Sequence, residues 1–195
     1  MIFVKLFTTL GVMREALKDY FASGSWKAFI EDVSSFMETS VCYLVMDHRQ
    51  KLWTHRNDNP LCARAHRTET GENLCKRDYE EHLEACRLSG KPGLFQCHMG
   101  LVRIVIPVKM ANGTTVFLGM CGMRTWRRVP ERLLTHAATL GITQREVMAL
   151  HSKVHYMPLK RIRTMTRILE HLIHSITELL TIKEQLKTLA TRTPA

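Results

Sequence analysis

The stretch L-V-R-I-V-I-P-V-K-M-A-N-G-T-T-V-F-L-G-M-C-G, residues 101–122, contains two apolar runs separated by a short polar segment. Runs of this length that are rich in Val and Ile are typical of buried strands. Between them lies the pair Asn112-Gly113, a strong hairpin signal, because both central residues of a tight hairpin turn need positive φ angles. The stretch therefore predicts an antiparallel hairpin, with one strand over 101–109 and the next over 115–122.

Two further strands are predicted upstream of this hairpin. The run V-C-Y-L-V-M-D, residues 41–47, is apolar enough for a buried strand, and K-L-W-T, residues 51–54, follows it after a turn. A charged segment over 70–89 carries its apolar residues at positions typical of a helix. The predicted order is therefore a strand pair, an inserted helix and a strand hairpin.

Helices are predicted at both ends of the chain. Residues 14–38 have a helical pattern that Gly24 divides in two, with Ser25 as the cap of the second helix. The pattern is helical again from residue 130 onward. An antiparallel sheet with helices packed on one side accommodates this order. We therefore expect the α+β class, with a PAS-like antiparallel sheet, flanking helices and a long C-terminal helix.

The composition is that of one globular domain. The chain has 195 residues and 45% hydrophobic content, which is enough for a sizeable core and an extension. It contains no run of about 20 apolar residues, so we expect no membrane span. Its start, M-I-F-V-K-L-F-T-T-L, lacks the basic lead and the small-residue cleavage site of a secretion signal. We therefore expect a cytoplasmic protein, in which disulfides are uncommon.

The net charge of +10 makes DNA binding by a small basic transcription regulator one hypothesis. The segment 140–150 resembles the opening of a helix-turn-helix, with Thr143 and Glu146 as a capping box. A recognition helix should follow after a short turn, but Pro158 opens a long helix instead, which argues against this use of the segment. Solvated faces are the simpler interpretation of the basic residues. These form two clusters: Arg124, Arg127, Arg128 and Arg132, and Lys160, Arg161, Arg163 and Arg167.

The six cysteines are the residues that most suggest chemistry. None lies in a C-x-x-C pair, so the close ligand pairs of a zinc finger or ribbon are missing from the sequence. Cys42 lies in an apolar strand and Cys86 on a helix, where both can serve as small core residues. The other four come from dispersed elements and could hold an iron–sulfur cluster, while three thiolates with His98 as the fourth ligand could hold zinc. Unlinked thiols that line a pocket or a core are the competing interpretation. The four are Cys62, Cys75, Cys97 and Cys121.

Five short motifs follow one another in a distinctive order. They are L-C (61–62), N-L-C-K-R-D (73–78), F-Q-C-H-M-G-L (95–101), I-P-V (106–108) and L-G-M-C-G-M (118–123). This order resembles the PocR sensory domain family over roughly residues 28–180, and the C-H-x-G-L element is its most specific part. The matching residues are Cys62, Cys75, Asp78, Cys97, His98, Gly100, Leu101, Pro107, Gly119 and Gly122.

The resemblance implies a non-enzymatic bacterial or archaeal sensor that binds a small metabolite, a simple hydrocarbon derivative such as a short diol. It implies a ligand site that includes Asp78, Cys97, His98 and Gly100. Met123 stands where the family has a Gln, so a ligand that touches this position would be different or less polar. Such sensors usually continue into an effector, and we expect this one to act on a separate kinase or transcription regulator. The expected segments are an N-terminal helical segment (1–27), the sensor domain (28–157), an amphipathic helix (158–190) and a tail (191–195).

Over residues 159–190, the positions of a heptad seam recur at alternating spacings of three and four. Such a seam is typical of a coiled coil. We expect the first half of this helix to pack on the domain and the second half to pair with another chain, which gives a homodimer. One amphipathic helix that packs within its own chain is the alternative. The seam consists of Ile162, Met165, Leu169, Leu172, Ile176, Leu179, Lys183, Leu186 and Ala190.

Three hypotheses therefore stay open. The first is a dimeric ligand sensor, the second a redox or gas sensor that carries an iron–sulfur cluster or zinc, and the third the DNA-binding regulator. The first two differ in whether the four cysteines converge on a metal. We predict that Cys62, Cys75 and Cys97 lie within a few ångströms of one another.

Overall fold

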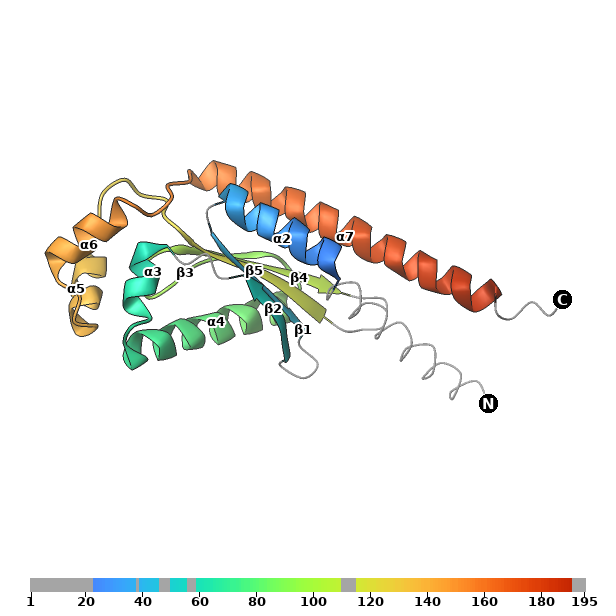
Figure 1. Cartoon of the computed structure of the whole chain (residues 1–195), viewed down its shortest axis with the longest axis horizontal. Coiled ribbons are helices and arrows are strands. Elements are labelled where there is room, and N and C mark those ends of the chain that lie inside the picture. The colour runs from blue at the N-terminus through green and yellow to red at the C-terminus, as the bar shows by residue number, and fades with distance from the viewer. Residues whose placement is uncertain (1–22, 38, 46–49, 56–58, 110–114, 191–195) are drawn as a thin grey trace.

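The computed structural model of the chain describes residues 23–37, 39–45, 50–55, 59–109 and 115–190 (Figure 1). Its centre is a five-stranded antiparallel sheet with the strand order β2-β1-β5-β4-β3. The α+β class, the PAS-like antiparallel sheet and the long C-terminal helix are thereby confirmed. The strands are β1 (Ser40–Val45), β2 (Gln50–His55), β3 (Gly93–Gln96), β4 (Val102–Lys109) and β5 (Thr115–Met123).

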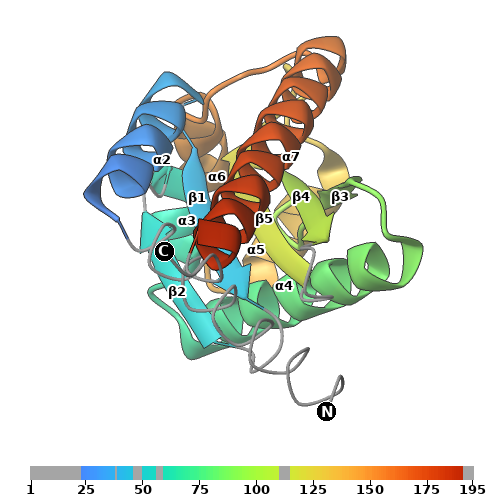
Figure 2. The ribbon, with the colours of Figure 1, turned by 90° about the vertical axis from the view of Figure 1, so that its right-hand side faces the viewer.

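Helices cover both faces of the sheet (Figures 1 and 2). The helices α2 and α7 lie over one face and α4 lies under the other, while α3, α5 and α6 gather at one end of the molecule. The sequence had suggested helices on one side alone. Because helices cover both faces, β4 is buried at seven successive positions, as expected for a strand between two layers. The helices are α2 (Gly24–Met37), α3 (Pro60–Ala65), α4 (Glu69–Ser89), α5 (Glu131–Thr139), α6 (Gln144–His151) and α7 (Leu159–Ala190).

Alternate residues of β4 belong to different layers of the core. Val102, Ile104 and Ile106 pack in the cluster that includes residues of α2 and α7. Val105 packs with residues of α4 and with Phe117 of β5 on the opposite face. A third cluster joins α3, α5 and α6 to the segment between β3 and β4. The side chain of each β4 residue is thus assigned to one layer by the pleat.

Most of the predicted elements are found, with small shifts at their ends. The hairpin strands are 102–109 and 115–123, while the turn at 110–114 lies outside the described residues. The helix predicted over 70–89 begins at Glu69 and ends at Ser89. Two short elements had not been predicted: β3 and α3 have only four and six residues, too few for a periodic pattern.

The start of α2 differs from the prediction. The helix begins at Gly24 itself, and the hydroxyl of Ser23 accepts a hydrogen bond from the backbone N–H of Trp26 at 3.3 Å. The capping side chain is therefore that of Ser23 and not that of Ser25. The helix predicted before Gly24 falls on residues that lie, up to residue 22, outside the described part of the chain. The side chain of Cys42 also lies outside the described part.

The segment 140–150 forms a capped helix that is not followed by a recognition helix. Thr143 and Glu146 form the predicted capping box at the start of α6. The chain then leads directly into α7. Arg124 and Arg127, between β5 and α5, both place the guanidinium over the ring of Tyr156, which lies between α6 and α7, 5.4 and 5.6 Å from its centroid. Part of the first basic cluster therefore has a structural role.

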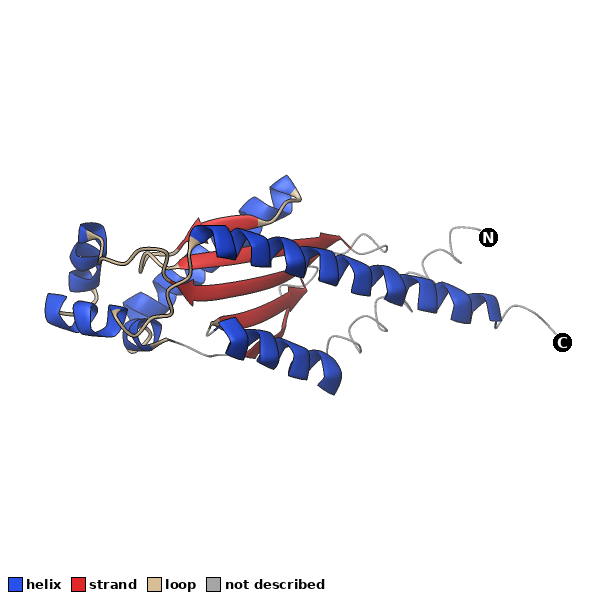
Figure 3. Ribbon diagram, turned by 90° about the horizontal axis from the view of Figure 1, so that it is seen from above, coloured by secondary structure: helices blue, strands red, loops and turns tan. Residues whose placement is uncertain are grey.

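The helix α7 lies along the sheet and extends beyond its end (Figure 3). Its core-facing residues are Ile162, Leu169 and Ile173, all nearly inaccessible to solvent. The predicted heptad seam therefore divides between two faces, because Leu172 and Leu179 are exposed. Among the described residues, no helix combines the length and the apolar character needed to span a bilayer.

Candidate ligand-binding site

One face of α4 carries the polar residues of the candidate site. Cys75, Asp78, Tyr79 and His82 recur at spacings of three and four along this helix, so their side chains share one face. The helix is held at its start by Thr68, whose hydroxyl accepts from the backbone N–H of Gly71 at 3.1 Å. The helix packs against β3 and β4, so its polar face meets β4 and the turn that precedes it.

The turn between β3 and β4 presents the Cys-His pair. The backbone N–H of Gly100 donates to the carbonyl of Cys97 at 2.7 Å, and that of Cys97 donates to the carbonyl of Leu101 at 2.9 Å. Gly100 has a φ of 67°, and a Cβ there would lie 3.2 Å from the ring of Trp126. Met99 and Leu101 are buried in the cluster of α3, α5 and α6. The turn is therefore firmly anchored, and Gly100, a predicted ligand residue, has a conformational role in it.

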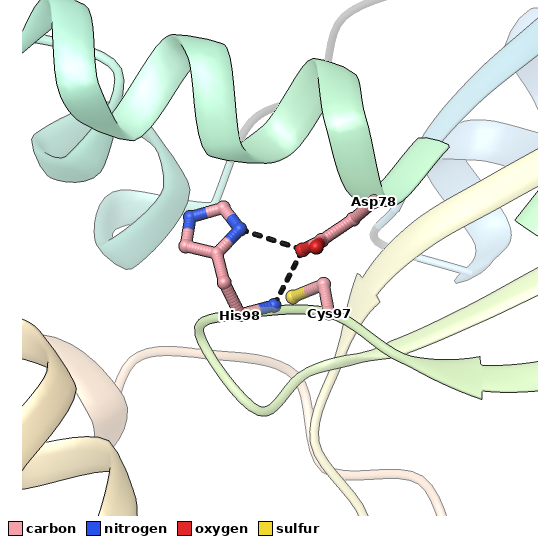
Figure 4. A group of neighbouring side chains, drawn as sticks. All are labelled: Asp78, Cys97 and His98. Atoms are coloured by element: carbon pink, nitrogen blue, oxygen red, sulfur yellow. Dashed lines mark hydrogen bonds and ion pairs between the residues drawn. The ribbon is translucent and has the colours of Figure 1, made fainter. Parts of the chain in front are cut away.

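Asp78 holds His98 by both its backbone and its ring (Figure 4). Its Oδ2 accepts from the backbone N–H of His98 at 2.6 Å and lies 2.8 Å from Nδ1 of the ring. A carboxylate only accepts hydrogen bonds, so Nδ1 carries the proton and Nε2 is left as an acceptor. The His98 side chain is only 5% exposed. The predicted ligand residues Asp78, Cys97 and His98 are thus brought together.

The ring of His98 is neutral at physiological pH. Burial lowers the pKa of His98 below its ordinary value, and the opposing hydrogen bond and charge of Asp78 do not restore it. The ring meets that of His136 from α5 edge to face, with centroids 5.6 Å apart. Nε2 of both rings is buried without a hydrogen-bond partner among the described residues. Two buried polar atoms on adjacent rings therefore lack a described hydrogen-bond partner.

The side chain of Arg103 lies on the face of the sheet that α4 covers. It is only 3% exposed, although it carries a charge. Its Nη2 donates to the sulfur of Cys75 at 3.5 Å, and its Cζ lies 5.1 Å from the centroid of the Tyr79 ring. Its cross-strand neighbour on β5 is Cys121, and residues paired in this way project on the same face. A buried guanidinium thus lies among the cysteines that the sequence had suggested as metal ligands.

The cysteines near Arg103 differ in acidity. Burial raises the pKa of Cys97 to about 11, since the positive charge of Arg103 offsets only part of this effect. Burial also acts on Cys75, but a hydrogen bond from His66 and the charge of Arg103 outweigh it, so the pKa of Cys75 lies below its ordinary value. Cys75 is therefore the more reactive thiol of the two.

Cys62 is held at the start of α3 by Asn59. The amide Nδ2 of Asn59 lies 3.2 Å from the sulfur of Cys62 and donates to the carbonyl of Gly122 at 3.0 Å. Its Oδ1 accepts from the backbone N–H groups of Leu61 and Cys62. Gly122 has a φ of 101°, and a Cβ there would lie 2.7 Å from Nδ2 of Asn59. The motif glycine Gly122 thus permits a contact between α3 and the end of β5.

Within the described residues, one group of three side chains has ligand atoms close enough together to hold a metal ion. It consists of Asp78, Cys97 and His98, whose ligand atoms all lie within 4.8 Å of one another. Cys97 and the alternative ligand His98 of the predicted metal set belong to it. Cys62, Cys75 and Cys121 do not, so the site of four cysteines stays a prediction.

Met123 lies apart from the other predicted ligand residues. It is inaccessible to solvent and packs in the core cluster of α2 and α7, on the opposite face of the sheet from Arg103. A contact between Met123 and a ligand stays a prediction. The position of Met123 in the core cluster of α2 and α7 does not favour such a contact. Cys86, in contrast, is buried beside Val105 and confirms the prediction of a core cysteine.

Arg103, His136 and His66 were not predicted from the sequence. Arg103 had a usable signal, because it is the one charged residue inside the apolar run from 101 to 108. A charge in a strand that is buried on both faces needs a partner or a function. The two histidines gave no such signal, since they come from helices that contribute to the site through the tertiary fold alone.

The fold is an antiparallel α+β domain with a buried polar cluster between α4 and the sheet. The chain matches the family model described as the sensory domain found in PocR over residues 19–181, which is most of its length. It therefore belongs to the PocR sensory domain family, a family of sensors and not of enzymes. No curated protein and no solved structure matches the chain.

Proposed function

We propose that this chain binds a small metabolite at the cluster of Asp78, Cys97, His98 and Arg103, and that it signals as a cytoplasmic homodimer without catalysing a reaction. The observation that carries the proposal is the set of buried polar atoms without partners among the described residues. These are Nε2 of His98 and of His136, and Nε and Nη1 of Arg103. Buried donors and acceptors are nearly always satisfied in native proteins, so a polar ligand is the natural partner for them.

The route from the cluster to α7 is short. Cys121 and Gly122 lie at the end of β5, and the next residues lead to Arg124. The backbone of Arg124 accepts from the N–H of Met157 at 2.9 Å and donates to the carbonyl of His155 at 3.0 Å. Met157 directly precedes Pro158 and α7, and His155 lies two residues before Met157. A shift of the end of β5 on ligand binding would therefore move the start of α7.

The exposed face of α7 supports a homodimer as the output. Five apolar residues lie on it at heptad spacings of four, seven, three and four, each more than a third exposed: Ile168, Leu172, Leu179, Ile182 and Leu186. They form a second stripe beside the core-facing one. A parallel coiled coil of two α7 helices would bury this stripe. The dimer would then act on a separate effector protein, such as a kinase or a transcription regulator.

Ligand binding is tested by isothermal titration calorimetry with a panel of short alcohols, diols, amides and carboxylates. Binding by the wild type that is lost in His98→Ala, but kept in the exposed control His171→Ala, supports the proposal. Binding that survives His98→Ala, or a panel without any binder, contradicts it.

Dimerisation is tested by sedimentation of the full chain. We expect a dimer that Leu179→Glu together with Leu186→Glu converts to a monomer, while Gln185→Glu, an exposed position beside the stripe, leaves it unchanged. A wild-type monomer at high concentration would remove the dimeric output from the proposal.

A metal-loaded sensor is the second candidate. It is favoured by the close approach of the ligand atoms of Asp78, Cys97 and His98, a donor set that suits zinc. The positive charge of Arg103 nearby opposes a cation, which is why the metabolite is placed first. Metal and sulfide analysis of protein purified without oxygen tests this candidate. Stoichiometric zinc that is lost in Cys97→Ala supports it, iron with sulfide would assign the cysteines to a cluster, and metal-free protein contradicts both.

A further inference from the structure

The guanidinium of Arg103 has more donors than the described residues can satisfy. The group carries five N–H donors and no acceptor. Nη2 donates to Cys75, whereas Nε and Nη1 are buried without a hydrogen-bond partner among the described residues. A thiol sulfur is a weak acceptor, and the Cζ of Arg103 lies over the Tyr79 ring, 5.1 Å from its centroid, which is a cation–π contact and not a hydrogen bond to an oxygen or nitrogen acceptor. Two of the three guanidinium nitrogens of Arg103 therefore have no described acceptor.

The charge of Arg103 also lacks a described carboxylate partner. Asp78 is the acidic residue of this cluster, but its Oδ2 already accepts two hydrogen bonds from His98. The described hydrogen bond of the Arg103 side chain is to a thiol, that of Cys75. A buried charge without a partner of opposite charge strongly destabilises a protein. We therefore expect a negatively charged group to bind Arg103.

We propose that Arg103 recognises a carboxylate on the sensed metabolite, so that the ligand class is short-chain monocarboxylates. This inference rests on the proposed function, that is, on metabolite binding at this cluster. A single negative charge matches a single guanidinium, while a second one would be repelled by the nearby Asp78. The aromatic rings of Tyr79 and Phe95, which pack in the core cluster beneath α4, would cover the carbon chain. Nε2 of His98 is left to accept from a hydroxyl on the same ligand.

Cys75 and Cys121, the neighbour of Arg103 on β5, are the competing partners of Arg103, and Cys75 is the one that accepts a described hydrogen bond. The pKa of Cys75 lies below the ordinary value of a thiol, after burial is offset by His66 and Arg103. As a thiolate it would neutralise the guanidinium within the protein, and an uncharged ligand would then be preferred. The two cases predict opposite preferences between a carboxylate and its amide, which has nearly the same shape.

The experiment is a calorimetric comparison on the full chain of acetate, propionate, butyrate and lactate with their amides. We expect at least one carboxylate to bind about tenfold or more tightly than its amide, because hydrogen bonds to a charged group are about twice as strong as neutral ones. Arg103→Gln should abolish this preference. The matched control Arg161→Gln, an exposed arginine of α7, should keep it. An amide that binds as tightly as its carboxylate overturns the inference and leaves the proposed function in place.

A second measurement on the wild type covers the case in which Arg103→Gln does not fold. The Nε–H resonance of Arg103 is followed in a proton–nitrogen correlation spectrum, and it is assigned by its loss in Arg103→Lys. A downfield shift on addition of the carboxylate, and none with the amide, supports the inference. An unchanged resonance at saturating carboxylate overturns it. Binding of alcohols or diols alone overturns the inference too, whereas failure of every compound removes the proposed function with it.

Discussion

The hydrogen bonds from His98 to Asp78 should contribute measurably to the stability of the fold. Asp78 accepts from the backbone N–H and from Nδ1–H of His98 at 2.6 and 2.8 Å, and its side chain is 12% exposed, so solvent screens the contacts little. In Asp78→Asn the two acceptor bonds become neutral, which costs about 1 kcal/mol each, or about 2 kcal/mol together. In Asp78→Ala the buried backbone N–H also loses its partner, which adds about 1–3 kcal/mol.

The assay is urea denaturation followed by circular dichroism, with thermal melting beside it. For a domain of this size, about 1 kcal/mol lowers Tm by about 2–4 °C, so Asp78→Asn should lose about 4–8 °C and Asp78→Ala more. The matched control is Glu80→Gln, an exposed acidic residue on the same helix, which should stay within about 0.5 kcal/mol of the wild type. If Asp78→Asn were as stable as the control, the two contacts would not hold the turn, and the reasoning about His98 would be refuted.

Three further outcomes follow from the same geometry. The free energy of unfolding should fall as the pH drops below about 6.5, because the pKa of buried His98 is lowered in the folded state and the unfolded chain binds the extra proton; equal denaturation midpoints at about pH 5.5 and pH 7.5 would contradict this. At neutral pH, iodoacetamide should modify Cys75 faster than Cys97, whose pKa is about 11, and peptide mapping by mass spectrometry that finds the reverse order would show that the thiol acidities are misassigned. Gly122→Ala should destabilise the fold more than Gly141→Ala, since both have positive φ angles but only the first would crowd a neighbouring side chain; the strain alone is worth about 1–2 kcal/mol, and similar melting temperatures for the two variants would speak against the contact.

The large elements were predictable because their signals are local. The hairpin of β4 and β5 follows from two Val/Ile-rich runs around Asn112-Gly113, and α4 and α7 follow from helical spacing. The short elements β3 and α3 were missed because four and six residues cannot establish a period. The side of the sheet that α4 covers was equally hidden, since an apolar strand shows that both faces are buried but not by which helix.

The candidate site was predictable only in part. The motif order pointed to Asp78, Cys97 and His98, and the fold brings these three together. The sequence also grouped Met123 with them, but a one-residue step along a strand moves a side chain to the other face of a sheet. Met123 follows Cys121 by two residues, yet the irregular pairing at Val102 and the positive φ of Gly122 separate their faces. Such a local irregularity leaves no periodic trace in the sequence.

In β4, Arg103 and Ile104 connect the candidate site with α7, the helix proposed to carry the signal. The side chain of Arg103 meets α4, while Ile104 beside it packs in the core cluster that α7 shares. A ligand that draws the guanidinium toward it would twist β4 locally, and the adjoining isoleucine would press on or release α7. Because close-packed interfaces respond to such shifts by changing their packing and not by gradual deformation, a small movement at Arg103 can produce a discrete change in α7. Leu172 and Leu179 lie on the exposed face of that helix, so the change would reach the face proposed for the homodimer contact.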